Sequence, residues 1–255
     1  MSKGKLQKFA EMETFPNVFQ YPFAVLKEQG FPLKGRWHAD YFRNDNPITL
    51  ELGCGKGEYT VGLARQYPDR NFIGIDIKGA RMYTGAKQAV DEGLTNVAFL
   101  RTHIEFVEHF FAADEVEQLW LTFSDPQMKN PRKRLTSTYF LERYRHFLVD
   151  GGFVHLKTDS NFLFTYTTLM AERNRLDVLL HTTNLYAEAT REQLAEAASI
   201  QTYYESMWMA RGLDIKYMKF RLPHDGALQE PDVEIELDDY RSYHRDKRSS
   251  KSTAK

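Results

Sequence analysis

The chain has 255 residues, of which 42% are hydrophobic and 14% aromatic, enough to build the core of one elaborated α/β domain. No apolar run approaches the roughly 18 residues that a membrane span requires, and the first residues lack the apolar stretch of a secretory signal. The single cysteine, Cys54, excludes an internal disulfide and a cysteine-based zinc site. These features predict a cytoplasmic protein with no membrane partner and no metal.

The formal net charge is only −1, but the charges are segregated along the chain. Basic residues gather at the N-terminus, at 129–134 and in the tail, whereas acids concentrate at 230–240. Binding to a polyanion depends on local rather than net charge. The distribution is therefore compatible with a nucleic-acid partner, although basic termini often serve only solubility.

From residue 48 onward, short apolar runs alternate with segments of helical period. Strands are predicted at 48–53, 71–77, 96–102, 118–124, 153–159, 175–185 and 214–222. Helices are predicted at 57–68, 78–93, 137–152, 161–173 and about 203–211. This alternation predicts an α/β fold with a mostly parallel, seven-stranded sheet and helices on both faces.

Both ends of the chain differ from this alternating region. Residues 1–47 are interrupted by prolines and are predicted to be an N-terminal extension that wraps the core. Residues 48–222 form the predicted domain, and residues 223–255 an acidic and then basic tail, disordered beyond about residue 242.

The segment "ELGCGKGEY" joins the first predicted strand to the first predicted helix. Gly53, Gly55 and Gly57 allow a tight turn and a close approach of a ligand to the backbone, although a simple turn would also use glycine. Glu51 would repel a phosphate but suits a ligand with an ammonium and a sulfonium. Asp76 ends the next strand, where an acid accepts hydrogen bonds from ribose, unless it only forms a turn. Together these residues favour S-adenosylmethionine and a Rossmann-like methyltransferase fold.

Two further strand ends are expected to contribute to this site. His103 or Thr102 would lie near the adenine after the third strand, although a histidine there is more often a surface or capping residue. Asp125 follows the fourth strand, which should neighbour the first, so its carboxylate would face the donated methyl group. The alternative is that Ser124 to Pro126 form an Asx-type turn.

A dense cationic cluster follows Asp125. Its members are Lys129, Arg132, Lys133 and Arg134, in a loop too rich in proline and asparagine to be helical. A solvated surface is the ordinary explanation for such a run. Beside a reaction centre, it more often binds phosphates, and each neutralised phosphate releases counterions.

Four motifs together resemble the tRNA (guanine-N7-)-methyltransferases of bacteria: "ELGCGKG", "FSDPQMKNPRKRLT", "GGFVHLKTDS" and "TYYESMWMARG". The resemblance covers roughly residues 40–221. It implies methyl transfer from S-adenosylmethionine to N7 of guanosine 46 in the tRNA variable loop, and it makes residues 48–222 the methyltransferase domain.

The resemblance also implies roles for individual residues. Glu51, Asp76 and the position of His103 correspond to cofactor contacts, and Asp125 corresponds to the essential acid, placed against the cofactor. The implied substrate contacts are Lys129, Asp159, Thr202, Tyr203, Tyr204 and Glu205. The chain departs from the family in having Gln127 where tryptophan is usual, His103 where aspartate is usual, and an additional proline in the cationic loop.

The residues near 202 and Asp159 also have structural interpretations. Thr202 and Glu205 have the spacing of a capping box, which is compatible with substrate contact at a helix N-terminus. Tyr203 or Tyr204 could stack on a base, although burial is the commoner fate of an aromatic residue. Asp159 could cap the following helix.

The chemistry expected at guanine N7 needs no general base, because N7 carries a lone pair and no proton. Placement of the reacting atoms and compensation of the charge that develops on the purine are required instead. Asp125 is assigned this role, which Asp159 could share. The remaining alternatives are a methyltransferase acting on another RNA, a protein or a small molecule, and a non-catalytic RNA-binding protein with this fold. A nicotinamide dehydrogenase fits least. Monomer and homodimer both remain open.

Overall fold

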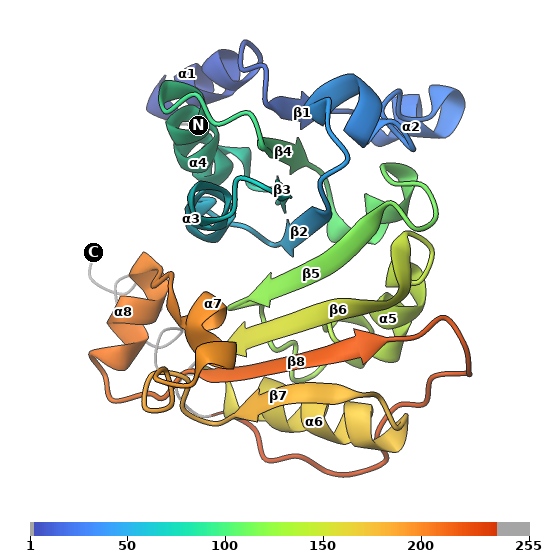
Figure 1. The fold of residues 1–255 in the computed structure, drawn as a ribbon, viewed down its shortest axis with the longest axis vertical. Coiled ribbons are helices and arrows are strands. Elements are labelled where there is room, and N and C mark those ends of the chain that lie inside the picture. Colours follow the sequence, from blue (N-terminus) through green and yellow to red (C-terminus); the bar gives the residue numbers. More distant parts are fainter. Residues whose placement is uncertain (1–2, 239–255) are drawn as a thin grey trace, which may run out of the picture.

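The computed structural model describes residues 3–238, which are organised around one eight-stranded sheet (Figure 1). The strand order is β1-β4-β3-β2-β5-β6-β8-β7. Strands β1 to β6 are parallel in their pairings, β8 is antiparallel to β6, and β7 is antiparallel to β8. The strands are β1 (Val18–Gln20), β2 (Ile48–Leu52), β3 (Asn71–Ile75), β4 (Val97–Arg101), β5 (Val116–Thr122), β6 (Leu148–Thr158), β7 (Val178–Thr182) and β8 (Lys216–Leu222).

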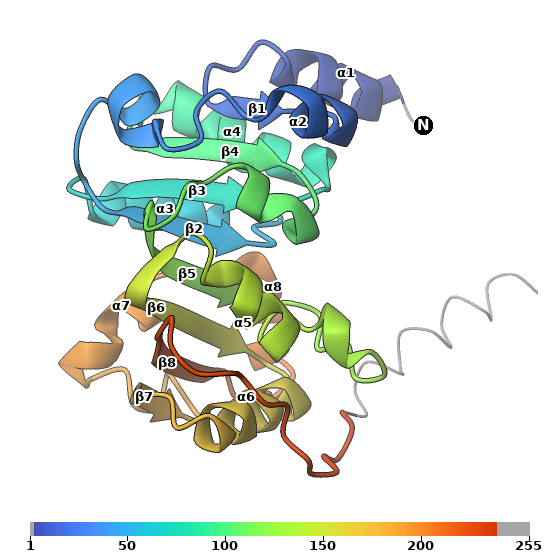
Figure 2. The same cartoon turned by 90° about the vertical axis from the view of Figure 1, so that its right-hand side faces the viewer.

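Helices cover both faces of this sheet, as Figures 1 and 2 show. The α-helices are α1 (Lys3–Met12), α2 (Phe23–Gln29), α3 (Glu58–Gln66), α4 (Gly79–Asp91), α5 (Thr138–Tyr144), α6 (Asn161–Arg173), α7 (Ala195–Ala198) and α8 (Tyr203–Met209). Short 3-10 turns lie at Ile104–His109, Pro131–Lys133 and Glu192–Leu194, and a π-helix at Trp37–Phe42. Buried side chains of α3, α4 and α7 form one core, and those of α5, α6 and the N-terminal segment form the other. The predicted Rossmann-like α/β fold is confirmed.

The predicted strand count of seven is wrong, because the N-terminal segment adds a strand. β1 pairs in parallel with β4 at the edge of the sheet. It has three residues between Pro16 and Pro22, too few to show a strand period in the sequence. The fully buried Trp37 then donates from its indole nitrogen to the Phe110 carbonyl at 3.0 Å, so this segment also enters the core.

The predicted helix at 137–152 is also wrong in its second half. α5 ends at Tyr144 and β6 begins at Leu148, so Gly151 and Gly152 lie within the strand. The apolar residues around position 147 satisfied the helical period, but they are buried between β6 and the helices. At these glycines the pairing of β6 with β5 shifts register, and a Cβ on Gly152 would come within 2.6 Å of the Leu148 side chain. The glycines therefore mark a bulge and not a helix end.

Residues 223–238, here called the strap, have no helix or strand and run back over α5 and α6. Arg145 donates to the carbonyls of Pro223, Asp225 and Gly226 at 2.7–2.9 Å. Glu230 accepts hydrogen bonds from the first residue of α5 and, at 2.5 Å, from Tyr166 of α6. The strap is therefore fastened to both helices.

The expected disorder beyond residue 242 lies outside the described residues, and the domain boundaries at 47 and 222 remain predictions. None of the helices within residues 3–238 has the length and apolar character to cross a membrane.

Candidate active site

A cavity of about 580 Å³ opens at the carboxyl ends of β2, β3, β5 and β6. In a parallel sheet this edge gathers the loops that follow the strands, which explains why distant sequence motifs meet there. Among the residues predicted from sequence, those that line it are Glu51, Gly53, Gly55, Asp76, Asp125, Lys133, Asp159, Thr202 and Tyr204.

The glycine loop has the properties of a ligand cradle. Gly53 and Gly55 have positive φ angles of 85° and 57°, and a Cβ at either position would meet no atom within 4 Å. Gly57 is different: a Cβ there would lie 2.7 Å from the ring of Phe99, so this glycine permits close packing of the loop. Asp76 holds the loop in place by accepting a hydrogen bond from the Gly55 amide at 2.9 Å. Its other oxygen accepts from the Lys78 amide, two residues further along the chain, at 2.7 Å.

Glu51 lies on the floor of the cavity and is buried. One carboxylate oxygen accepts from the Thr60 amide at 2.9 Å and from its hydroxyl at 2.5 Å, and the other accepts from the Thr122 hydroxyl at 2.6 Å. Burial raises the pKa of Glu51 to about 7, although these hydrogen bonds act in the opposite direction. A carboxylate so placed is stabilised in its charged form by a cationic ligand.

His103 does not line this cavity, so its predicted contact with the adenine is not supported. The side chain is exposed and packs edge-on to Phe106 in a neighbouring hollow, while Ile104 faces the cavity after β4. The sequence could not distinguish two adjacent residues at a strand end, because either can point inward.

Asp125 lies at the mouth of the cavity, on a loop with an unusual backbone. Phe123 and Gln127 have positive φ angles of 51° and 46°, a conformation that costs free energy and that often occurs at functional sites. The Asp125 carboxylate accepts from the Gln127 amide at 2.9 Å, so the Asx-type turn does form. The turn orients the acid at the end of β5.

Asp159 is buried at the end of β6 and lines the cavity. The N-cap of α6 is Ser160, whose hydroxyl accepts from the Leu163 amide at 3.0 Å. The capping interpretation of Asp159 is therefore excluded. Its main-chain oxygen accepts a hydrogen bond from the Lys216 ammonium at 3.2 Å.

The capping box at the start of α8 is confirmed, but Glu205 is not placed to contact a substrate. Its carboxylate is fully buried and pairs with the ammonium of Lys157 of β6 at 2.7 Å. Lys157 also donates to the carbonyls of Ala197 and Ile200 at 2.8 and 2.9 Å, and Tyr186 donates to Glu205 at 2.6 Å. This cluster fixes the N-terminus of α8, which presents Thr202 and Tyr204 to the cavity.

The four cations of the 129–134 loop have different environments. Lys129, Arg132 and Lys133 are exposed, and Lys133 lines the cavity. Arg134 is buried: it donates to the carbonyls of Pro126 and Met128 and lies over the rings of two aromatic residues of α6. The predicted phosphate contact by Arg134 is therefore not supported. The loop also contains a single 3-10 turn, where no helical structure was expected.

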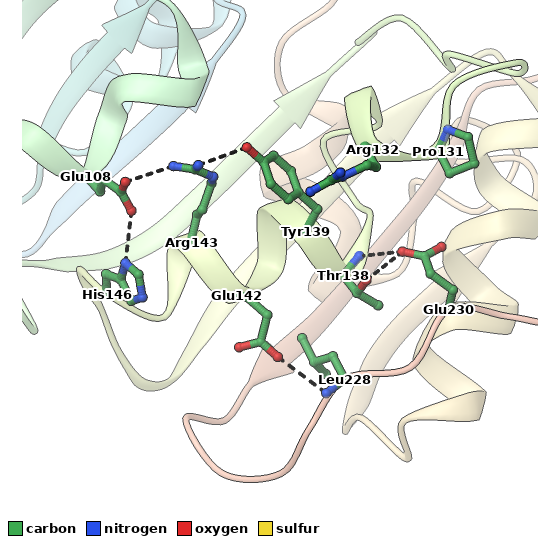
Figure 3. A pocket seen from close by; sticks show the side chains of 10 residues that line it. All are labelled: Glu108, Pro131, Arg132, Thr138, Tyr139, Glu142, Arg143, His146, Leu228 and Glu230. Carbon is green, nitrogen blue, oxygen red and sulfur yellow. Dashed lines mark hydrogen bonds and ion pairs between the residues drawn. The ribbon is translucent and has the colours of Figure 1, made fainter.

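Arg132 turns away from the first cavity and lines a second one of about 540 Å³, between the loop, α5 and the strap (Figure 3). Most polar groups in this second cavity bind one another. Arg143 pairs with Glu108 at 2.8 Å and donates to the Tyr139 hydroxyl at 2.8 Å, and a ring nitrogen of His146 lies 2.9 Å from the Glu108 carboxylate (Figure 3). These pairs join α5 and the residue after it, His146, to the 3-10 turn at Ile104–His109.

Comparison with known proteins agrees with this geometry. The model of a family described as "Putative methyltransferase" matches residues 45–218. A tRNA (guanine-N(7)-)-methyltransferase of Bacteroides thetaiotaomicron is 60% identical over the full length of both chains. Another, of Porphyromonas gingivalis, is 59% identical over 93% of this chain and 98% of its own. The chain belongs to the tRNA (guanine-N7-)-methyltransferase family. The resemblance found in the sequence motifs is confirmed.

Solved structures share the fold at much lower identity. An antibiotic-related methyltransferase has a TM-score of 0.55 and 13% identity, and covers 76% of this chain and 96% of its own. The 16S rRNA methyltransferase KamB has a TM-score of 0.54 and 14% identity, and covers 80% of this chain and 95% of its own. They support the fold assignment alone.

Several residues at this cavity were not predicted from the sequence. Lys56 lies over the ring of Tyr203 at 4.6 Å, and Arg81 lies 6.0 Å from that of Tyr204, so cations flank both exposed tyrosines. The "GCGKG" motif drew attention to its glycines and not to its lysine. Thr60 and Thr122 gave no sequence signal, because their contacts with the buried acid exist only in the fold.

The raised pKa of Glu51 predicts that the stability of the fold and the affinity for a cationic ligand change in opposite directions with pH. Between its ordinary value of 4.5 and about 7, the folded state binds more protons at Glu51 than the unfolded state, so this residue lowers stability as pH rises. A cationic ligand prefers ionised Glu51, so S-adenosylmethionine should bind about tenfold more weakly at pH 6 than at pH 8. Isothermal titration measures the affinity, and Glu51→Gln should abolish most of the pH dependence. A wild-type affinity that is flat over this range would contradict the placement of the cation.

The buried pair of Lys157 and Glu205 predicts strong coupling in a double-mutant cycle. Lys157→Met or Glu205→Gln should each lower the free energy of unfolding by about 3–5 kcal/mol, because each leaves a buried group without its partner. The double variant should lose less than the sum of the two. Urea unfolding measures these values, and additive losses would show that the pair is not coupled.

Proposed function

We propose that this protein transfers the methyl group of S-adenosylmethionine to N7 of guanosine 46 in the variable loop of tRNA, in the cytoplasm, with residues 48–222 as the catalytic domain. The observation that carries the proposal is the distribution of charge at the site. Buried Glu51 and Asp159 lie within the cavity, whereas the exposed cations Lys78, Arg81 and Lys133 lie on its rim. A cationic donor suits the interior, and an anionic polymer suits the rim.

The residues of the glycine loop fit the expected cofactor. Open space over Gly53 and Gly55 lets a ligand contact the backbone, and the carboxylate of Asp76 stands at the end of β3, where ribose hydroxyls would donate to it. Glu51 would attract the ammonium. The cofactor, when bound, supplies an activated methyl group on a sulfonium centre. In place of His103, the side chains of Ile77 and Ile104 line the cavity and would give the adenine an apolar surface.

Asp125 is the group that acts on the acceptor base. Guanine N7 attacks with its own lone pair, so no side chain needs to remove a proton first. The Asp125 carboxylate can accept hydrogen bonds from the N1–H and N2–H₂ edge and offset the positive charge that develops on the purine. The turn after β5 holds this acid at the cavity mouth, so little reorganisation is needed during the reaction. Asp159, buried at the end of β6, adds a second carboxyl group to the lining of the cavity.

Substrate binding follows from the exposed groups around the mouth. Lys129, Arg132 and Lys133 project from the loop that follows Asp125 and can contact phosphates on either side of the target nucleotide. Tyr204 lines the cavity and is 40% exposed, so its ring can stack on a base. Because base stacking tolerates any sequence, these contacts position the tRNA, whereas the cavity selects guanine.

The direct test is methylation of an unmodified tRNA transcript, with the modified nucleotide mapped by chain cleavage at 7-methylguanosine. Methylation should be confined to position 46 and absent from a transcript with adenosine there. Asp125→Asn keeps the size of the side chain and an oxygen that can accept from Gln127. It should lower kcat by about 10²–10³-fold, because charge compensation is lost.

The affinity of Asp125→Asn for S-adenosylmethionine should stay within a few-fold of wild type. If that affinity falls by orders of magnitude instead, Asp125 is mainly a cofactor contact. If the wild-type protein methylates no guanosine of tRNA, the proposed function is wrong.

The salt dependence of tRNA binding should distinguish the exposed cations of the loop from the buried Arg134. Changing Lys129, Arg132 and Lys133 together to Gln should lower the slope of log affinity for tRNA against log salt by about 2–3. A control with the same number of changed cations replaces Arg65, Lys87 and Arg221 by Gln, since none of these three lines the cavity. Arg134→Met should lower the melting temperature and leave the slope nearly unchanged. An equal effect of the loop variant and the control would locate the RNA elsewhere.

A further inference from the structure

We infer that Gln127 recognises O6 of the target guanine and so helps the cavity to select guanine over adenine. This assignment rests on the proposed function, which brings the acceptor base to Asp125. Gln127 lines the same cavity as Asp125 and stands two residues after it, in the loop that follows β5. Its side chain is half-buried, so the amide is partly shielded from water.

The turn at Gln127 does not explain why the residue is a glutamine. Its φ angle is 46°, in the left-handed region, where glycine and asparagine are the usual residues. The turn uses only the main chain of Gln127: its amide donates to Asp125 at 2.9 Å, and its carbonyl accepts from the Asn130 amide at 2.9 Å. Glycine would supply both groups without strain. Strained residues of this kind occur often at functional sites, which directs attention to the side chain.

The main chain is also fixed on both sides of Gln127. The buried guanidinium of Arg134 donates to the carbonyls of the two neighbours, Pro126 at 3.2 Å and Met128 at 2.8 Å. Among residues 3–238, the side-chain amide of Gln127 makes no hydrogen bond to another group. The residue therefore offers an unused amide from a backbone that is held in place, which reduces the entropy lost on binding a base.

Guanine presents four polar positions in a row: the N2 amine, N1–H, the carbonyl oxygen O6 and N7. In the proposed reaction, the Asp125 carboxylate accepts from the N2 amine and N1–H, while N7 faces the methyl group. O6 lies between these groups and is an acceptor. It loses its hydrogen bonds to water when the base enters the cavity, which is costly unless a donor of the protein replaces them. The amide of Gln127 can supply this donor beside Asp125.

A neutral donor suits O6 better than a cation. O6 and N7 are neighbours on the purine, and positive charge develops at N7 as the methyl group arrives. An ammonium bound to O6 would stand close to that charge and would raise the barrier. Lys133 lines the cavity but carries such a charge, and the hydroxyl oxygen of Ser124 is buried and so is not open to the cavity. The Gln127 amide avoids both difficulties.

Adenine would meet unsuitable groups at both residues. It carries an amine in place of O6 and an unprotonated N1 in place of N1–H. The N1 lone pair would face the Asp125 carboxylate, and the amine would face the NH₂ of Gln127 unless the amide turned over. A site whose polar groups are left unpaired by the wrong substrate rejects that substrate strongly. Gln127 and Asp125 together therefore favour guanine.

The test is a cycle of two changes, one in the protein and one in the base. Gln127→Met keeps the length of the side chain and removes the donor, and 6-thioguanosine at position 46 replaces O6 by sulfur, a weaker acceptor. Each change alone should lower kcat/KM by about three- to tenfold, the effect of one neutral hydrogen bond. In Gln127→Met, the thio substitution should change kcat/KM by less than about twofold, because the bond is already lost. The same thio penalty in both proteins would overturn the inference.

Three controls separate recognition of O6 from other roles. Inosine at position 46 lacks only the N2 amine, so its penalty should be equal in the wild type and in Gln127→Met. The salt slope of tRNA binding and the affinity for S-adenosylmethionine should be unchanged in Gln127→Met, because O6 is neither a phosphate nor part of the cofactor. Gln66→Met changes an exposed glutamine that does not line the cavity and should behave like wild type. An inosine penalty that depends on residue 127, or a changed salt slope, would overturn the assignment to O6.

The two proposals fail differently. If the wild-type protein methylates no guanosine of tRNA, the proposed function fails. If the wild type methylates position 46 and Gln127→Met does so equally well, only the role of Gln127 is refuted.

Discussion

One buried carboxylate joins the three elements that surround the cavity. Glu51 of β2 accepts hydrogen bonds from Thr60 of α3 and Thr122 of β5, so the strand, the helix after the glycine loop and the strand that leads to Asp125 are held together. Hydrogen bonds to a charged group contribute about 1.5–3 kcal/mol each. They offset part of the desolvation that raises the pKa of this acid to about 7. The same group that organises the site therefore keeps it poised to receive a positive charge.

Other acids of the chain have a related role at helix N-termini. Glu205 completes the capping box of α8, Glu230 binds the start of α5, and Asp238 binds the start of α6. All three helices begin beside the cavity or its cationic loop, because helices that follow parallel strands start at the carboxyl edge of the sheet. Helix N-termini attract anions, including phosphates. By occupying these ends with its own carboxylates, the protein leaves the exposed lysines and arginines of the rim as the groups to which the proposed function assigns RNA binding.

Features that depend on a short stretch of sequence were predictable, whereas features that depend on pairing between distant segments were not. The glycine loop, Asp76 and Asp125 were predictable, because each lies directly at the end of a strand whose apolar pattern is clear. β1 was not predictable, since a strand of three residues between Pro16 and Pro22 is too short to show a period. In the sequence, Gly151 and Gly152 resembled a helix end. Glycines occur both at helix ends and at strand bulges, and here only the pairing of β6 with β5 distinguishes a bulge from a helix end. The apolar period before them fits a helix and a buried strand equally well.

For individual side chains, the sequence could not show the direction in which each one points. His103 and Ile104 are neighbours, and the sequence cannot tell which faces the cavity. Glu205 belongs to a motif that was expected to contact substrate. Its carboxylate instead pairs with Lys157, which is 48 positions away in the sequence. The two residues meet only because α8 packs on β6. Four adjacent cations looked equivalent, yet Arg134 is enclosed by main-chain carbonyls and aromatic rings.

The burial of Arg134 gives the cationic loop the fixed path that its proposed role in RNA binding requires. A loop with exposed cations on every side would repel itself and would have no fixed path. Arg134 instead ties the end of the loop to the carbonyls of Pro126 and Met128 near its beginning. The loop is thereby closed on itself directly after Asp125, and Lys133 is held toward the cavity while Arg132 is held away from it. One buried cation thus gives the exposed ones fixed positions relative to Asp125, which is what the proposed transfer to a single ring nitrogen requires.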